Sequence, residues 1–266
     1  MNLMKLVVAV ALVLCTQIGL CITNGTVDNN RHPNVGTVVA EFRTPGVKDQ
    51  ACSGTLISPV VFLTAGHCIV LLQQVFGVSQ VWVTFDPVFS PSATLYPGSM
   101  HLNPAYPGTG NSDPEDMGVI VLDNPVVGIT PATLPSPGLL DRMFADHTLN
   151  NTLFTIVGYG ATDTVFGGGP PDAMQGRGTR RYATEGFTAL RPYLLDLNMN
   201  TVFGYGGSNS GDSGGPIFLG AGNSETNVEV AIVYSGDRWG TAQDLPYRLD
   251  TPQARAFLGQ YVTLLP

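Results

Sequence analysis

The chain has 266 residues, of which 44% are hydrophobic and 12% are charged, and it contains 32 glycines and 20 prolines. So many turn-forming residues between short apolar runs favour an all-β fold of one or two domains. The formal net charge is −8, which is the wrong sign for binding nucleic acid or an anionic membrane surface, so we expect neither as a partner.

Residues 1–21 have the pattern of a secretory signal peptide. A positive charge at Lys5 precedes an apolar core from Leu6 to Leu14, and small and polar residues follow. The alternative is an uncleaved membrane anchor, but polar residues interrupt the run of about 20 apolar residues that a membrane span needs. We therefore expect a secreted, extracellular protein without stable membrane association.

Short β-rich runs then recur between clusters of Gly, Pro, Asn and Asp, which indicates a sandwich or barrels rather than alternating strands and helices. The predicted strands are residues 35–42, 53–57, 60–64, 81–85, 119–122, 152–157, 186–189, 216–219 and 229–234.

Three irregular segments and one helix complete this outline. Residues 87–107 and 166–171 are predicted to be long surface loops. The proline-rich segment 131–138 is predicted to connect two halves of the chain, because proline cannot donate to a sheet. A helix is predicted over 253–261, after an N-cap at Thr251 and a proline, as the single helix of note.

Cys52 and Cys68 are the two cysteines that remain once residues 1–21 are removed, and they would pair in an oxidising compartment. His67 precedes Cys68 in CSGTLISPVVFLTAGHC, so the disulfide would hold it at the end of the second strand of a hairpin. A general base needs such a rigid mount. Taken alone, His67 fits a structural histidine beside a disulfide equally well.

The other histidines, His32, His101 and His147, lie in irregular contexts and are expected at the surface. No two histidines or cysteines have zinc-ligand spacing such as HExxH or CxxC. No nucleotide or flavin motif occurs either, so we expect no metal and no catalytic cofactor.

Asp116 borders the apolar run from Gly118 to Leu122, where a buried carboxylate could orient a histidine. Asp113 and Asp123 lie outside that run and are interpreted as turn residues. Taken alone, Asp116 also fits a residue that caps a strand end.

Ser213 lies in GDSGGP, residues 211–216, where glycines leave little side chain to bury and let the backbone turn tightly. The segment is therefore predicted to be a loop that displays this serine. It becomes a nucleophile if a base and an orienting carboxylate are available elsewhere in the chain.

Together, TAGHC at residues 64–68, EDMGVIVL around Asp116 and GDSGGP around Ser213 resemble the trypsin/chymotrypsin family of serine peptidases, in its order of His, Asp and Ser. The resemblance spans residues 22–266 and implies two packed six-stranded antiparallel β-barrels with a short C-terminal helix. The first barrel would cover about 22–133, the second about 134–250 and the helix about 251–261.

The resemblance also implies a role for each matching residue. Ser213 would be the nucleophile, His67 the general base and Asp116 the group that orients the imidazole. The backbone N–H groups of Gly211 and Ser213 would form the oxyanion hole.

Ile22 occupies the place of the mature N-terminus in this family, whose α-amino group forms a buried ion pair with the position of Asp212. We expect cleavage after Cys21, at the end of the signal peptide, to expose that amine. No Arg or Lys precedes Ile22, so a trypsin-like activating cut is not supported.

The substrate pocket carried over from the family consists of Gly207, Ser208, Tyr234, Ser235, Gly236 and Leu245. No acid stands at 207, the pocket floor, so a preference for Arg or Lys is not supported. Leu245 would shorten the pocket, which favours small or medium apolar side chains.

The sequence therefore predicts a secreted serine endopeptidase that acts on polypeptides through an acyl-enzyme on Ser213. It is expected to be a monomer, with protein inhibitors among its partners. Two alternatives from other classes are a catalytically silent binding protein of the same family and an esterase or acyltransferase that uses the same three residues.

Overall fold

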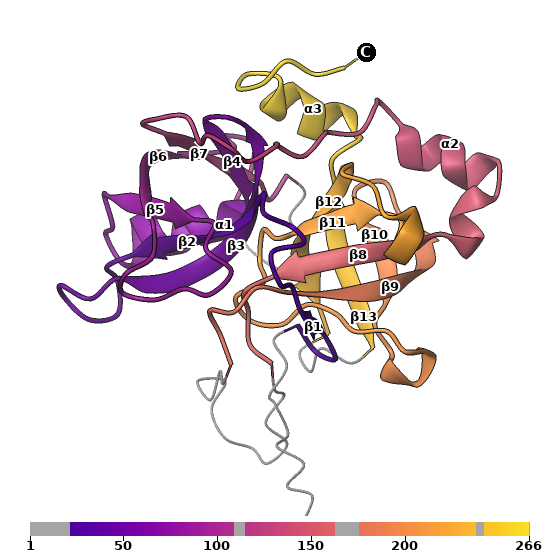
Figure 1. The fold of residues 1–266 in the computed structure, drawn as a ribbon. Helices are drawn as coiled ribbons and strands as arrows, with labels where there is room; N and C mark the ends of the chain where they lie inside the picture. The colour runs from indigo at the N-terminus through magenta and orange to yellow at the C-terminus, as the bar shows by residue number, and fades with distance from the viewer. Residues whose placement is uncertain (1–21, 109–114, 163–175, 238–241, 266) are drawn as a thin grey trace, which may run out of the picture.

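The computed structural model describes residues 22–108, 115–162, 176–237 and 242–265, and it shows two closed antiparallel β-barrels and a short C-terminal helix (Figure 1). This architecture confirms the expected fold. The predicted signal peptide and the 166–171 segment lie outside the described residues. In chain order the elements are β1 (Thr26–Val27), β2 (Val35–Ala40), β3 (Asp49–Ser58), β4 (Val61–Thr64), α1 (Gly66–Val70), η1 (Leu71–Val75), β5 (Val81–Thr84), β6 (Tyr96–Leu102), β7 (Gly118–Leu122), α2 (Leu139–Ala145), η2 (Thr148–Asn151), β8 (Leu153–Gly158), β9 (Arg181–Leu190), β10 (Leu195–Asn198), η3 (Thr201–Phe203), β11 (Pro216–Leu219), η4 (Gly222–Ser224), β12 (Glu229–Gly236), β13 (Gln243–Arg248) and α3 (Pro252–Leu258).

The first barrel closes in the strand order β2-β3-β4-β7-β6-β5. Its interior is filled by side chains that alternate along the strands, among them Val38, Leu56, Phe62, Val83 and Ile120, and all five are almost completely buried. Closure leaves this barrel without an exposed edge strand.

The second barrel is formed by β9-β10-β13-β12-β11-β8, and it closes because β8 pairs with β9 as well as with β11. Strand β1 adds to the outer side of β9, where Thr26 is opposite Tyr182. The barrel core includes Phe154, Leu197 and Ile217, each fully buried.

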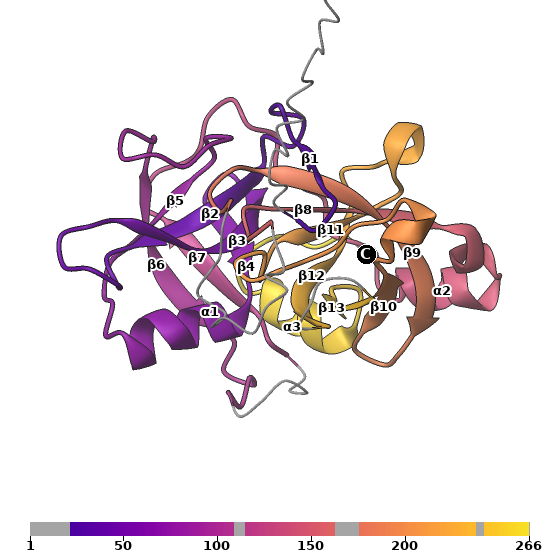
Figure 2. The same cartoon turned by 90° about the horizontal axis from the view of Figure 1, so that it is seen from below.

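The two barrels lie side by side, and α3 packs where they meet (Figures 1 and 2). One buried cluster joins Leu63 and Met117 of the first barrel to Tyr247 of the second and to Phe257 of α3. Leaving this apolar surface exposed would cost free energy, so the cluster fixes the two barrels against each other. Any site at their junction is therefore held on a rigid support.

The connecting segment 131–138 contacts both barrels. The Ala132 N–H donates to the Leu56 carbonyl in β3, at 2.8 Å, and the Glu229 N–H in β12 donates to the Thr133 carbonyl, at 2.9 Å.

Several predicted elements were wrong or incomplete. The supposed surface loop 87–107 contains β6, and strands β10 and β13 were not predicted. Strand β6 carries Pro97 and Gly98 and is only partly buried, so its sequence lacks the apolar alternation by which strands are recognised. The C-terminal helix is α3, and the Thr251 hydroxyl caps it by accepting from the Ala254 N–H at 3.2 Å. It is not the single helix of note, because α2 lies between the barrels in the chain.

None of the helices among the described residues combines the length and the apolar character that crossing a membrane requires.

His32 is 5% exposed, so its predicted surface position was wrong. Its Nδ1 contacts Asp28 and its Nε2 lies 2.8 Å from Glu225 Oε1, while its ring stacks on Phe218. Arg180, also buried, pairs with Asp28 at 2.8 Å. Burial alone would lower the pKa of His32, but the hydrogen bonds with Asp28 and Glu225 and their charges together raise it above its ordinary value. This cluster clamps the N-terminal segment to the second barrel.

We expect His32→Gln to lower the free energy of unfolding by about 2 kcal/mol near pH 6, and by less near pH 9. The folded-state pKa of His32 is raised, so its stabilising contribution is complete below the unfolded pKa of about 6.5 and is lost as pH rises through the folded pKa. Urea unfolding across this range measures the gap between wild type and variant. The exposed His101→Gln is the control, and a gap for His32→Gln that widens with rising pH would contradict the clamp.

Candidate active site

His67 and Asp116 meet at the end of the first barrel. His67 is the second residue of α1, which follows β4, and Asp116 lies just before β7, the strand that pairs with β4. A Cβ on Gly66 would lie 3.0 Å from Asp116 Oδ1, so glycine allows the helix to approach the carboxylate this closely. The strand pairing therefore brings together two residues that are 49 positions apart in the chain.

The Asp116 carboxylate accepts two hydrogen bonds from His67. Its Oδ1 accepts from the backbone N–H at 2.6 Å and its Oδ2 from ring Nδ1 at 2.7 Å. Asp116 is fully buried, whereas the His67 side chain is 33% exposed. A carboxylate can only accept, so Nδ1 carries a proton and the neutral ring presents Nε2 as a lone pair. This is the tautomer that a general base needs.

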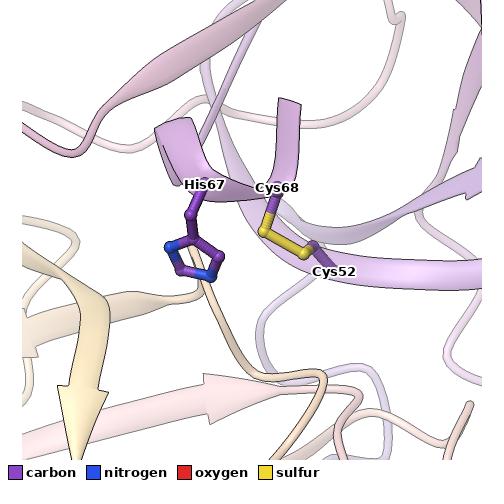
Figure 3. A group of neighbouring side chains, drawn as sticks. All are labelled: Cys52, His67 and Cys68. Carbon is purple, nitrogen blue, oxygen red and sulfur yellow. A yellow bond between two sulfur atoms is a disulfide. The ribbon is translucent and has the colours of Figure 1, made fainter. Parts of the chain in front are cut away.

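A disulfide anchors this histidine. Cys68 of α1 is bonded to Cys52 of β3, and the His67 ring lies beside the bond (Figure 3). Ring nitrogen and sulfur atoms of the three residues lie within 4.8 Å of one another, as in some metal centres. The two sulfurs are bonded to each other, however, and offer no thiolate ligands. The group is therefore interpreted as a mount for His67.

The loop that carries Ser213 packs against the same part of the first barrel. The Ser213 carbonyl accepts from the Ser53 N–H at 3.0 Å and lies 3.9 Å from Cys68 Sγ. Gly214 has a φ of +78°, and a Cβ there would lie 2.3 Å from Thr64 Oγ1. Glycine at 214 thus lets the GDSGGP loop reach the TAGHC segment.

The Ser213 side chain is half-buried, and no described residue forms a hydrogen bond with its hydroxyl. Such a hydroxyl remains available to His67 Nε2, because hydrogen bonds between catalytic groups often shorten only when substrate binds.

Gly211 turns its peptide with a φ of +100°, in the region that favours glycine. The Ser53 hydroxyl donates to its carbonyl at 2.9 Å, which fixes the orientation of the loop. Within the described part of the chain, neither the Gly211 nor the Ser213 N–H has an acceptor. Two unpaired amide N–H groups beside a serine can donate hydrogen bonds to an oxyanion.

Asp212 points into the second barrel and is fully buried. Its carboxylate accepts from the N–H groups of Gly160, at 2.7 Å, and Asn209, at 3.0 Å. No salt bridge among the described residues includes it, and burial raises the pKa of Asp212 to about 7. A cation placed beside the Asp212 carboxylate would offset most of the free energy that it costs to bury this charge.

Ile22 is fully buried in the second-barrel core. The next residue, Thr23, exchanges two hydrogen bonds with Gly207, at 3.0 and 3.1 Å. In the chain as given, the Ile22 nitrogen is part of a peptide bond, so it carries no charge to pair with Asp212.

Several of the residues assigned to the substrate pocket lie close together in the second barrel. The Ser208 N–H donates to Asp244 Oδ2 at 3.1 Å, and Gly236 is paired with Asp244 across β12 and β13. Ser235 is opposite Leu245 in the same ladder.

Two buried acids next to Gly207 and Ser208 were missed from the sequence. A Cβ on Gly207 would lie 2.9 Å from Glu185 Oε1, and both Glu185 and Asp244 are fully buried. Burial raises the pKa of each, and the charge of Asp244 raises the pKa of Glu185 further. Neither carboxylate oxygen of Glu185 has a hydrogen-bond partner among the described residues. Glu185 lies in β9 and Asp244 in β13, each without a motif that marks it, so only the fold shows that the two acids lie close together.

A sequence profile of the family described as Trypsin matches residues 25–256 of this chain. The chain belongs to the trypsin family. Among its curated relatives is phenoloxidase-activating factor 3 of Holotrichia diomphalia, which is 27% identical over 217 residues. The alignment covers 74% of this chain and 60% of that relative, so the chain spans about 60% of the relative's length. Membership of the trypsin family confirms the resemblance read from the motifs and assigns the chain to a family of serine peptidase-type hydrolases.

Proposed function

We propose that this protein is a secreted serine endopeptidase that hydrolyses peptide bonds through an acyl-enzyme on Ser213. The observation that supports this most directly is the pair of hydrogen bonds from His67 to the buried Asp116, at 2.6 and 2.7 Å, beside the displayed serine. A purely structural histidine would not need a fixed tautomer that leaves Nε2 as an acceptor.

The proposed reaction assigns one step to each group. Ser213 Oγ attacks the scissile carbonyl while His67 Nε2 takes its proton, and Asp116 stabilises the resulting imidazolium. The amides of Gly211 and Ser213 donate to the oxyanion. His67 then returns the proton to the leaving amine, which departs. Water then attacks the carbonyl carbon of the acyl-enzyme while His67 takes a proton from it. His67 returns this proton to Ser213 Oγ as the carboxylic acid product leaves.

Activity on secretion is part of this proposal. Removal of residues 1–21 would give Ile22 a charged α-amino group. Asp212 is the buried carboxylate that we expect to form an ion pair with this group. The raised pKa of Asp212 supports this: its first cause is burial, and although the charge of Arg177 acts in the opposite direction, no salt bridge among the described residues includes Asp212.

Asp212→Asn is expected to have opposite effects before and after cleavage. In a chain extended by one residue before Ile22, wild type should lose stability relative to the variant as pH rises from about 4 to about 7, because the folded state holds the Asp212 proton more tightly than the unfolded state. In the mature enzyme the variant lacks the ion pair, so kcat/KM should fall more than about 100-fold, since breaking a buried pair costs about 3–5 kcal/mol. Urea unfolding and peptide hydrolysis measure the two effects. Equal activity of both mature forms would exclude the ion pair.

We propose small or medium apolar side chains for the residue before the scissile bond. Position 207, the expected floor of the pocket, is a glycine, so it offers no acidic side chain to a cationic substrate residue. Asp244 is buried and already accepts from the amides of Ser208 and Leu245, so it is not offered to a cationic side chain. We further propose that the enzyme is a monomer that acts on polypeptide substrates and binds protein inhibitors.

The proposal is tested by the intact mass of the secreted protein before and after reaction with a fluorophosphonate probe. We expect a chain that starts at Ile22 and gains one adduct, and no adduct on Ser213→Ala. Hydrolysis of casein by the same preparation separates a peptidase from an esterase. A correctly processed protein that gains no adduct would instead be a binding member of the family.

A further inference from the structure

Arg177 lies where the second barrel approaches the first, next to the loop of the candidate oxyanion hole. Its Nη2 donates to the carbonyls of Gln50, at 3.3 Å, and Ala51, at 3.1 Å, both in β3. Its Nε lies 3.1 Å from the point that a Cβ on Gly211 would occupy. The guanidinium is therefore held between β3 and Gly211.

This cation forms no salt bridge among the described residues, although the charges of Asp49 and Asp212 act on it from farther away. Nearby Arg43 is neutralised by Asp49, whose Oδ2 lies 2.7 Å from it, but no carboxylate forms a salt bridge with Arg177. The Arg177 Nε–H is buried and lacks an acceptor within the described part of the chain. Burial, followed by repulsion from Arg43, lowers the pKa of Arg177, while the charges of Asp49 and Asp212 act in the opposite direction, and the guanidinium remains charged. An anion beside the guanidinium would compensate this charge.

The reaction geometry decides which half of a substrate would meet Arg177. In the proposed mechanism His67 gives its proton to the leaving amine, so the leaving half of the peptide passes His67 and its disulfide. Ala51, which Arg177 contacts, directly precedes Cys52 of that disulfide. The pocket residues Gly207 and Gly236 belong instead to the second barrel and would hold the acyl half.

We propose that Arg177 selects substrates with an aspartate or glutamate at the first or second position after the scissile bond. The inference rests on the proposed peptidase function and specifies the substrates of that site. A carboxylate side chain that enters from solvent would accept charge-assisted hydrogen bonds from the guanidinium, which is already oriented by Gln50 and Ala51. Neutral amide side chains of the same shape would gain much less.

The test compares internally quenched peptides that differ only by Asp or Asn at the first or the second position after the cleaved bond. For wild type we expect kcat/KM to be about tenfold higher for Asp at one of these positions, the gain typical of a hydrogen bond to a charged group. Arg177→Gln should reduce this Asp/Asn ratio to about one, and Arg177→Lys should retain part of it. The ratio is the readout because it cancels differences between variants in the fraction of folded protein and in the intrinsic reactivity of Ser213. Arg43→Gln, which removes a cation already paired with Asp49, should keep the ratio.

Two outcomes would overturn the inference. One is a wild-type ratio near one at both positions. The other is an Arg177→Gln variant that loses rate equally on the Asp and Asn peptides, which would make Arg177 a structural tie between Gly211 and β3. A small ester substrate with no amino acid residue after the scissile bond reports on acyl-enzyme formation in every sample. If wild type neither hydrolyses the ester nor reacts with fluorophosphonate, the proposed peptidase function fails and the inference about Arg177 fails with it.

Discussion

His67→Ala and Ser213→Ala are each expected to lower kcat by about 10⁶-fold, and the double variant is expected to be no worse than either. The serine hydroxyl is a weak nucleophile until a base takes its proton, and the base has no function without the serine. The structure supports this coupling: the disulfide and Asp116 hold His67, and the Ser53 N–H holds the Ser213 backbone, at 3.0 Å, on the same β-strand as Cys52.

The measurement is single-turnover peptide hydrolysis by the mature proteins, with circular dichroism to show that each is folded. His101→Ala, at an exposed histidine, is the matched control and should keep wild-type activity. Losses that multiply in the double variant would mean that His67 and Ser213 act independently, which contradicts the proposed mechanism.

Asp116→Asn is expected to lower kcat by about 10⁴-fold at neutral pH while the protein remains folded. In the wild type both carboxylate oxygens accept hydrogen bonds, one from the His67 backbone N–H and one from Nδ1. An amide has one acceptor and one donor group, so it cannot accept from both. If its oxygen keeps the backbone bond, its NH₂ group faces Nδ1, and the ring must move its proton to Nε2. In that tautomer the ring can no longer take the Ser213 proton.

A pH–rate profile checks this explanation. The fluorophosphonate probe should label Asp116→Asn far more slowly than wild type, although Ser213 is intact. Asp123→Asn, at an exposed aspartate one residue beyond β7, is the control and should be unaffected. Wild-type labelling of Asp116→Asn would show that Asp116 does not set the tautomer.

The motifs located most of the candidate site because they are local. GDSGGP combines a serine with glycines whose backbone angles other residues disfavour, as the φ of +100° at Gly211 and +78° at Gly214 show. Likewise, TAGHC places His67 beside a cysteine whose partner lies 16 residues earlier. Short apolar strands such as β2 and β4, which are buried at every position, were recognised for the same reason, since an apolar run between turn residues is complete within a few residues.

The sequence by itself therefore determined the family, the two-barrel fold and the three residues proposed for catalysis. The tertiary structure alone decided the position of β6, the burial of His32, the acid pair Glu185 and Asp244, and the place of Arg177 beside Gly211. The physical reason is that a charged side chain can be buried only where distant segments supply partners. His32 is buried because Glu225, 193 residues away, accepts from its ring. Arg177 is held because the carbonyl of Ala51, 126 residues away, faces it, and no pattern within either segment reports a contact at such a separation.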